Sequence, residues 1–570
     1  MEEKNDIVRL KIITTSDIHG NFFQYDFIEN QVTTSSLSQI YTYVKEQRQH
    51  LDQEVVLLDN GDLLQGQPSV FYSNKILRDN PNYKHVCSEV LNFMQYDAAT
   101  LGNHDIEAGH EVYDNLRNAF NFPWLAANAI CKKTSEPYFE PYKLIFRKGL
   151  KIAVLGLVTP VIPYWVPEAK WEGIEFEDMV IAARKWVQHI KEVEKPDLLI
   201  GLFHSGIDYN YNRQNADTYK NENASILVAQ RVPGFDVVFA GHDHQEYNLK
   251  IENIAGQKVL VLNPQSYANF VSIVDIKMKY NNDTRRYEKY DITGYNLQMN
   301  FCEAEKEFKQ RFANYIAEIK KIVSEPIGEF SRSVSSREAL FGDTGFVDLV
   351  HRIQLDYTKA DISFAAPLSY DVVIKRGTVH IRDMFKLYKF DNVLYLIYMK
   401  GYEIKKYLEF SFGIWFNRMR SPDDTLLNFR YNHQGDLVLT EKYYNFSTAA
   451  GIIYTVNLKA PIGHKINIIS MADGSPFEPE KDYKVVMNSY RGNGGGGHLF
   501  DGVGLEPTEL RKRIIQAYTE DVRSIIINWI KQKQKVEIFA LKHWRAVPKN
   551  WWHKGRLISI NVLFDKKDNE

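Results

Sequence analysis

Cysteine is scarce in this chain, and the few cysteines present exclude two common roles. Only three occur among 570 residues: Cys87, Cys131 and Cys302. They lie far apart and lack the paired spacing of a cysteine zinc site. The composition therefore argues against a disulfide scaffold and against cysteine-bound zinc, and it leaves the redox compartment open.

Long apolar runs and net charge are also missing. No run is long enough to span a bilayer, and residues 1–6 lack the apolar segment of a signal peptide. This start fits a cytosolic protein or a mature end behind an added methionine. The formal net charge is −2, so no overall field attracts nucleic acid or an anionic membrane. We expect no membrane span, no nucleic-acid polymer as partner, and a monomer.

What the chain does contain is an alternation of strand-like and helical segments, which predicts an α/β fold. Its length predicts two or more domains. Helical patterns at 44–50 and 180–193 separate apolar runs that are typical of buried strands. These runs are 8–15, 54–58, 152–157, 198–203 and 237–240. In α/β folds, ligands gather where strands end.

The second half has a different pattern, which predicts a boundary. Residues 271–295 are β-like and polar, and apolar residues at helical spacing in 303–323 predict a connecting helix. We predict domains at 1–298 and 325–570, joined by a linker helix at 299–324. The second domain contains the following expected features: a helix at 346–357, a strand at 393–399, a glycine-rich loop at 492–497, helical character from 511 to 533, and an aromatic stretch at 544–552.

Five short motifs carry the chemistry, and several of them directly follow a strand-like run. They are Asp17-Ile18-His19, Gly61-Asp62, Gly102-Asn103-His104-Asp105, His204, and Gly241-His242-Asp243-His244. As ligands they offer four imidazoles, two carboxylates and one amide oxygen, with His104 as an extra histidine beside them. Such ligands suit Zn²⁺, Mn²⁺, Fe²⁺, Co²⁺ or Mg²⁺. A lone histidine is most often a hydrogen-bonded core or surface residue, but that reading does not explain five such motifs in this order.

The motifs predict two adjacent ions. A bridging carboxylate holds two ions about 3.5–4 Å apart, where they act on the attacking and leaving oxygens of a displacement. Asp62 is the natural bridge, because the other ligands come from separate loops. His242 and His244 are two residues apart and face the same side of an extended chain, so each can serve a different ion. His104 is placed to protonate a leaving alkoxide.

In combination these motifs resemble the calcineurin-like metallophosphoesterase superfamily, over residues 10 to about 275. The resemblance implies a four-layer α-β-β-α sandwich. It also implies attack on phosphorus by a metal-bound hydroxide, with His104 as acid. One ion would be held by Asp17, His19, Asp62 and His244, and the other by Asp62, Asn103, His204 and His242.

The second domain resembles the C-terminal domain of the 5'-nucleotidase family, which includes periplasmic 2',3'-cyclic-nucleotide 2'-phosphodiesterase/3'-nucleotidases. The matching segments are 345–357, 360–367, 387–392 and 487–497. The resemblance implies an α/β substrate domain in which Phe390 and Tyr490 stack on the base and Asn392 bonds to the base or ribose. Stacking contributes about 1–3 kcal/mol per base and tolerates any base. Without the resemblance, both rings would be read as core residues.

Two departures from 5'-nucleotidases matter. Their Gly-Gly-Gly-Ile-Arg motif is replaced here by Ala-Ala-Pro-Leu-Ser at 365–369, which resembles the cyclic-phosphodiesterase branch. Arg337 is still a plausible phosphate contact, and loss of one guanidinium suits a diester monoanion better than a phosphate dianion. Glu107 stands where 5'-nucleotidases carry aspartate, so it either orients His104 or is a solvated loop carboxylate.

These observations favour a dinuclear-metal enzyme, a 2',3'-cyclic-nucleotide 2'-phosphodiesterase/3'-nucleotidase acting on a nucleotide. A 5'-nucleotidase or UDP-sugar hydrolase is the alternative on the same scaffold. A nucleotide-binding protein without turnover is a third reading, which the complete ligand set disfavours. The resemblance implies a periplasmic or secreted location, while the sequence itself leaves a cytoplasmic one open.

Overall fold

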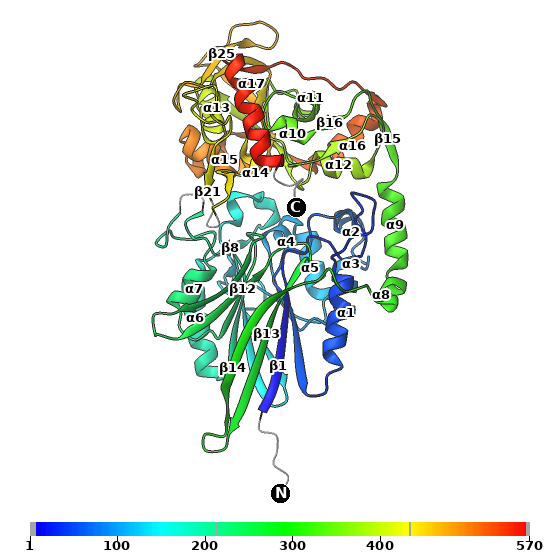
Figure 1. The fold of residues 1–570 in the computed structure, drawn as a ribbon, viewed down its shortest axis with the longest axis vertical. Helices are drawn as coiled ribbons and strands as arrows, with labels where there is room; N and C mark the ends of the chain where they lie inside the picture. Colours follow the sequence, from blue (N-terminus) through cyan, green and yellow to red (C-terminus); the bar gives the residue numbers. More distant parts are fainter. Residues whose placement is uncertain (1–6, 212–213, 432–434, 566–570) are drawn as a thin grey trace. The chain divides into compact units, whose positions relative to one another are not determined.

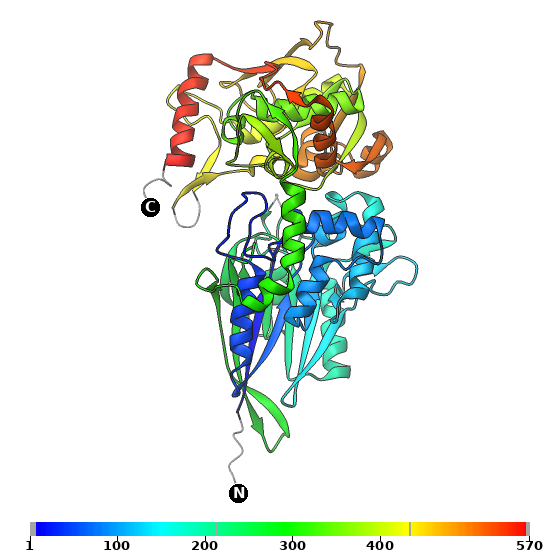
Figure 2. The same cartoon turned by 90° about the vertical axis from the view of Figure 1, so that its right-hand side faces the viewer.

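The computed structural model describes residues 7–211, 214–431 and 435–565. The chain divides into two compact units, Met1–Ile322 and Val323–Glu570, and each has its own sheets and hydrophobic core. Figures 1 and 2 show the ribbon from two sides. Across the described ranges, no helix combines the length and apolar character needed to cross a membrane.

The first unit contains two six-stranded sheets. The order of the first sheet is β14-β13-β1-β2-β3-β4 and that of the second is β11-β12-β10-β9-β7-β6. The first sheet consists of β1 (Ile7–Thr15), β2 (Gln53–Asp59), β3 (Ala98–Thr100), β4 (Trp124–Leu125), β13 (Phe270–Asn281) and β14 (Arg286–Gln298). The second consists of β6 (Tyr142–Arg147), β7 (Leu150–Val158), β9 (Leu198–His204), β10 (Val237–Ala240), β11 (Glu246–Glu252) and β12 (Lys258–Pro264).

The two sheets pack face to face, and helices cover their outer faces (Figure 1). Ile12 and Val56 of the first sheet share one buried cluster with Ile152 and Val237 of the second. The opposite face of the second sheet packs on α6 (Met179–His189) and α7 (Ser225–Arg231). The first sheet has α1 (Leu37–Arg48), α2 (Pro68–Asp79), α3 (Val86–Met94) and α5 (His110–Ala119) beside it. The predicted α/β fold is therefore confirmed, with the layers in the order α-β-β-α.

Burial explains why the strands could be read from the sequence. Every residue of β9 is buried, because both faces of its sheet are covered. The five predicted strands all occur, with ends within two residues of those expected. Helix α1 begins seven residues before the predicted helix at 44–50, and α6 continues as a short π-helical turn, Ile190–Glu194.

The helix predicted for 303–323 is in fact two helices. They are α8 (Lys306–Arg311) and α9 (Ala313–Val323), separated by Phe312, whose backbone is not helical (φ −104°, ψ 10°). The Phe312 ring is buried and lies 4.8 Å from Phe308 and 5.6 Å from Phe93, centroid to centroid. Packing of this aromatic cluster accompanies the break in a pattern that looked continuous.

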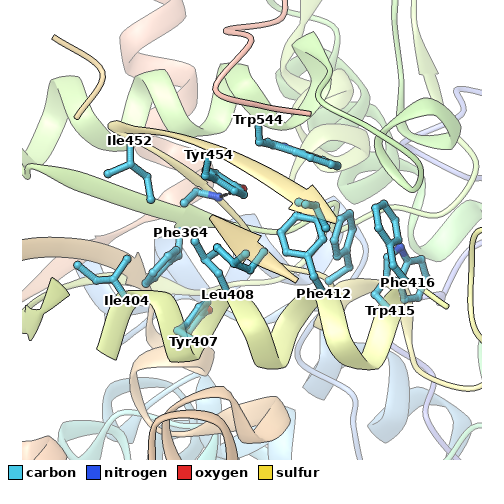
Figure 3. Packing of buried hydrophobic residues seen from close by; sticks show 14 of the residues in the cluster. Phe364, Ile404, Tyr407, Leu408, Phe412, Trp415, Phe416, Ile452, Tyr454 and Trp544 are labelled. Carbon is cyan, nitrogen blue, oxygen red and sulfur yellow. Dashed lines mark hydrogen bonds between the residues drawn. The ribbon is translucent and has the colours of Figure 1, made fainter. Parts of the chain in front are cut away.

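The second unit is built on a five-stranded sheet of order β23-β17-β26-β20-β27. Its strands are β17 (Ile362–Ala365), β20 (Val393–Lys400), β23 (Thr448–Ala450), β26 (Asp482–Asn488) and β27 (Ile514–Asp521). The core gathers around α13 (Gly401–Trp415), whose Tyr407 ring stacks on Phe364 of β17 at 3.9 Å (Figure 3). The predicted helix at 346–357 is α11 (Gly345–Thr358), and the predicted strand at 393–399 is β20.

The helical prediction for 511–533 is wrong in its first half. Residues 514–521 form β27, which pairs antiparallel with β20 at the edge of the sheet. Helix α16 (Val522–Lys533) begins only after Asp521, whose carboxylate accepts the backbone N–H of Ser524 at 2.8 Å. An aspartate in this position is a typical N-cap, so a helix starts there and does not run through it.

Candidate metal centre

The predicted ligands lie at or just after the carboxyl ends of β1, β2, β3, β9 and β10, and His204 is itself the last residue of β9. Their side chains therefore meet at the carboxyl edge of the two sheets. The backbone of five of them is left-handed. These are Asp17 (φ 52°), His19 (φ 51°), Asp62 (φ 60°), His242 (φ 72°) and His244 (φ 58°). Such a conformation costs a non-glycine residue roughly 1–2 kcal/mol. Strain of this kind persists where the surroundings impose it, typically at functional sites.

Asp17, His19 and His244 form the first cluster, with ligand atoms within 4.8 Å of one another. Nε2 of His19 lies 3.0 Å from Nε2 of His244, which in turn lies 3.3 Å from Oδ1 of Asp17. On the opposite side of the ring, Nδ1 of His19 donates to the carbonyl of Gln65 at 3.0 Å. Burial and the neighbouring His244 lower the pKa of His19 to about 3. His19 is therefore a neutral imidazole whose Nε2 lone pair points into the cluster.

Asp62, His204 and His242 form the second cluster, again within 4.8 Å. Nε2 of His204 lies 3.2 Å from Oδ2 of Asp62, while Nδ1 of His204 donates to the carbonyl of Asn60 at 2.6 Å. The amide oxygen of Asn103 lies 2.9 Å from Nδ1 of His242 and 3.2 Å from Nε2 of His204. All four side chains predicted for the second ion thus converge.

Histidines of both clusters act on the carboxylate of Asp62. Burial opposes its ionisation, but His204, His104 and His19 hold its pKa well below the usual range. Its Oδ1 accepts the backbone N–H of His104 at 2.8 Å. A Cβ on Gly102 would collide with that carboxylate, which explains the glycine before Asn103.

This donor set fits two divalent ions. Converging imidazole nitrogens, two carboxylates and an amide oxygen are ligands for borderline or hard cations. The two clusters are therefore candidate sites of a dinuclear centre.

His104 and Glu107 lie together on the short helix α4 (Asn103–Glu107), next to the clusters. Nδ1 of His104 is 2.6 Å from Oε2 of Glu107, and the His104 ring lies 5.4 Å from that of His19. Burial lowers the pKa of His104, but Asp62 and the bond to Glu107 outweigh it and raise that pKa to about 9. Of the two readings of Glu107, the contact favours orientation of His104 over a solvated carboxylate.

Three further residues contact the clusters and were not predicted. The Tyr267 ring lies 5.2 Å from His19 and 5.9 Å from His244, the Trp165 ring stacks on His242, and the Glu222 carboxylate faces His242. Trp165 and Tyr267 carried a usable signal, because they follow the carboxyl ends of β7 and β12, at the edge where the ligands gather. Glu222 lies in a long polar loop, far along the chain from the end of β9 at His204.

In the second unit, the two predicted stacking rings flank a third ring. Phe390 and Tyr490 lie 5.8 Å and 6.3 Å from Tyr444, at 78° and 86° to it. Tyr444 was not predicted. The backbone carbonyl of Tyr444 accepts from the buried Arg491, which also donates to the carbonyl of Gly495 in the glycine-rich loop.

The other two predicted substrate residues have protein partners. Asn392 is buried, and its amide oxygen accepts from Asn488 at 3.2 Å. Arg337 uses its guanidinium on both carboxylate oxygens of Asp371, with Nη2 to Oδ2 at 2.6 Å, and lies 4.4 Å from the centre of the Phe564 ring.

Comparison with known families agrees with this geometry. Residues 10–246 match the calcineurin-like phosphoesterase family, and residues 316–503 match the 5'-nucleotidase C-terminal domain. The chain is a hydrolase of the metallophosphoesterase/5'-nucleotidase family. This hydrolase therefore acts on nucleotide phosphoesters, and it combines the phosphoesterase domain with the nucleotidase domain in one chain.

Several proteins are similar to this hydrolase over most of its length. The 2',3'-cyclic-nucleotide 2'-phosphodiesterase/3'-nucleotidase of Salmonella typhimurium is 26% identical, over 95% of this chain and 89% of its own. The trifunctional nucleotide phosphoesterase protein YfkN of Bacillus subtilis is 25% identical, but this chain spans only 39% of it. A 5'-nucleotidase precursor from Thermus thermophilus has the same fold, with a TM-score of 0.64 and 18% identity over 95% of this chain and all of its own.

Proposed function

We propose that this hydrolase is a 2',3'-cyclic-nucleotide 2'-phosphodiesterase/3'-nucleotidase. The observation that carries the reaction class is the pair of ligand clusters with the His104–Glu107 pair beside them. Support for this branch comes from the relatives of that name, which align over 88–89% of their own length. The neutral segment 365–369, which lacks a phosphate-directed arginine, also favours a diester monoanion.

Two divalent ions, when bound, supply Lewis acidity and an activated water for the displacement at phosphorus. We assign Asp17, His19, Asp62 and His244 to one ion and Asp62, Asn103, His204 and His242 to the other, with Asp62 shared. His104 donates its proton to the leaving ribose oxygen. Glu107 fixes the His104 ring so that the proton points at that oxygen.

The second unit recognises the nucleoside in this proposal. Phe390 and Tyr490 stack on the base, and Tyr444 closes the side between them. Asn392 bonds to the base or ribose through its amide. Arg337 would reach a phosphate only by exchanging its pair with Asp371.

A substrate panel tests the branch. With Mn²⁺ or Co²⁺ added, 2',3'-cyclic AMP, 3'-AMP, 5'-AMP and UDP-glucose are compared in one assay by kcat/KM. We expect the cyclic nucleotide and 3'-AMP to be the preferred substrates. Preference for 5'-AMP or UDP-glucose would instead favour the alternative, a 5'-nucleotidase or UDP-sugar hydrolase. The 24% identity to a Vibrio cholerae 5'-nucleotidase is the reason to include these two substrates.

We also propose a monomer with a periplasmic or secreted location, which rests on family resemblance. Light scattering of the purified protein and fractionation of the source cells would test these two points.

A further inference from the structure

His242 is held on two sides by residues that are not ligands. Its Nδ1 faces the amide oxygen of Asn103 at 2.9 Å, so this nitrogen points toward the second cluster. Its Nε2 lies 3.3 Å from Oε1 of Glu222. The Trp165 ring stacks on the imidazole face with centroids 5.3 Å apart and planes at 23°. The ring therefore has little freedom to rotate away from the cluster.

The partner of the outward nitrogen of His242 differs from those of His19 and His204. The outward nitrogens of His19 and His204 donate to backbone carbonyls, of Gln65 and Asn60 respectively. His242 donates to a carboxylate. A carboxylate bonded to a ligand imidazole makes that imidazole a more basic ligand and adds a negative charge one step from the ion.

The charge distribution of the two ligand sets gives this carboxylate a role. The first set has a carboxylate of its own, Asp17, in addition to the shared Asp62. The second set has only the shared carboxylate, completed by the amide of Asn103 and the imidazoles of His204 and His242. Glu222 is placed to supply the charge that the second set lacks.

The position of Glu222 is fixed by its own backbone. Its N–H donates to the side-chain oxygen of Gln214 at 2.9 Å. Its carbonyl accepts from the hydroxyls of Thr159 at 3.0 Å and Ser205 at 2.8 Å. The side chain is 10% exposed. Three hydrogen bonds thus fix the backbone of Glu222, and its carboxylate is buried against His242.

We propose that Glu222 is a positioning residue for the second ion, which it stabilises by orienting His242 and adding negative charge, while Trp165 holds the face of the ring. The proposal rests on the dinuclear centre assigned above. Loss of such an outer partner typically costs about 10–100-fold in metal affinity. The effect is confined to one of the two ions.

Two variants, each lacking a ligand of one ion, allow the affinities of the two metal sites to be measured separately. His244→Ala removes a ligand of the first ion only, so its high-affinity Co²⁺ reports the second. His204→Ala does the reverse. Glu222→Gln is added to each background, because glutamine keeps an acceptor but removes the charge. Co²⁺ affinity is measured by competition with a chelator, together with the visible absorption spectrum of the bound ion.

We expect Glu222→Gln to weaken Co²⁺ about 10–100-fold in the His244→Ala background and less than about 2-fold in the His204→Ala background. The control is Asp114→Asn, since Asp114 pairs with His110 at 3.0 Å in the same unit and neither is a predicted ligand. This control should change neither affinity.

Equal losses in both backgrounds would overturn the proposal, since they would indicate a general effect on folding. No loss in either would overturn it as well. Glu222→Gln could weaken Co²⁺ only in the His244→Ala background while the unmodified protein hydrolyses no nucleotide. In that case the proposed function fails and the role of Glu222 stands.

Discussion

Among single residues, Asp62 has both carboxylate oxygens engaged in a buried position between the two clusters. It is buried, faces His204 through one oxygen, and accepts the His104 backbone through the other. We predict that Asp62→Ala abolishes hydrolysis and reduces bound metal from two ions toward none, because both ions lose a shared anion. Metal analysis and circular dichroism of the purified variant check this. Retention of two ions with near-normal turnover would show that Asp62 is not the bridge.

His104 makes a prediction that depends on the leaving group. A general acid contributes about 10²–10⁴-fold when the leaving group is a poor one. His104→Ala should therefore lower kcat for 2',3'-cyclic AMP by that factor, and lower it far less for bis(p-nitrophenyl) phosphate, whose leaving group needs no proton. Glu107→Gln should show the same trend more weakly. Equal losses on both substrates would assign His104 to phosphate binding and not to proton donation.

A functional residue can be predicted from the sequence when it belongs to a recognisable local motif. The seven predicted ligands lie in short motifs, several of them directly after apolar strands, and the structure brings them together. Glu222 could not be found in this way, because its placement depends on how the long loop between β9 and α7 folds back. The contact between Glu107 and His104 could only be posed as an alternative, since a three-residue spacing does not fix where a side chain points.

Among the elements, helix α11 carries a buried carboxyl with an unusual pKa. Burial and the neighbouring Asp343 raise the pKa of Asp348 to about 9, from 3.8. A raised pKa in the folded state means that this group's stabilisation is complete below pH 4 and is lost as pH rises toward 9. We predict that Asp348→Asn gains stability relative to the parent by at least about 1 kcal/mol between pH 5 and pH 8.

Urea unfolding at both pH values measures this difference. The control is Asp356→Asn on the same helix, whose pKa is lowered by bonds from Lys359 and Trp529. That variant should show no such gain with rising pH. A pH-independent effect of Asp348→Asn would show that the Asp348 carboxyl ionises without cost in the folded protein.

Element boundaries were predictable where burial alone sets them and not where one residue interrupts a pattern. Strands β9 and β10 match their predicted ends closely, since two covered faces leave a continuous apolar run. The break at Phe312 depends on an aromatic cluster formed with distant residues. Strand β27 was taken for helix because its pairing with β20 is not visible in the local sequence.

For the whole molecule, the proposed function assigns the chemistry to the first unit and the recognition of the base to the second. We predict that Tyr490→Ala lowers kcat/KM for 2',3'-cyclic AMP by roughly 5–150-fold, which corresponds to about 1–3 kcal/mol of stacking. Hydrolysis of bis(p-nitrophenyl) phosphate, which has no base, should stay unchanged. Tyr490→Phe keeps the ring and should behave like the parent. Equal losses on both substrates would argue against a base clamp.

Because each of the two units has its own hydrophobic core, we expect the units to unfold in separate transitions. Among the residues that the structure describes, the candidate metal clusters lie in the first unit. Ions that bind only the folded state stabilise it by about 2.7 kcal/mol at a hundred times Kd. We predict two calorimetric transitions, of which a chelator lowers one by a few degrees and leaves the other in place. Asp348→Asn at pH 8 should shift only the transition that the chelator spares. One transition that responds to both treatments would mean that the two units unfold as a single cooperative body.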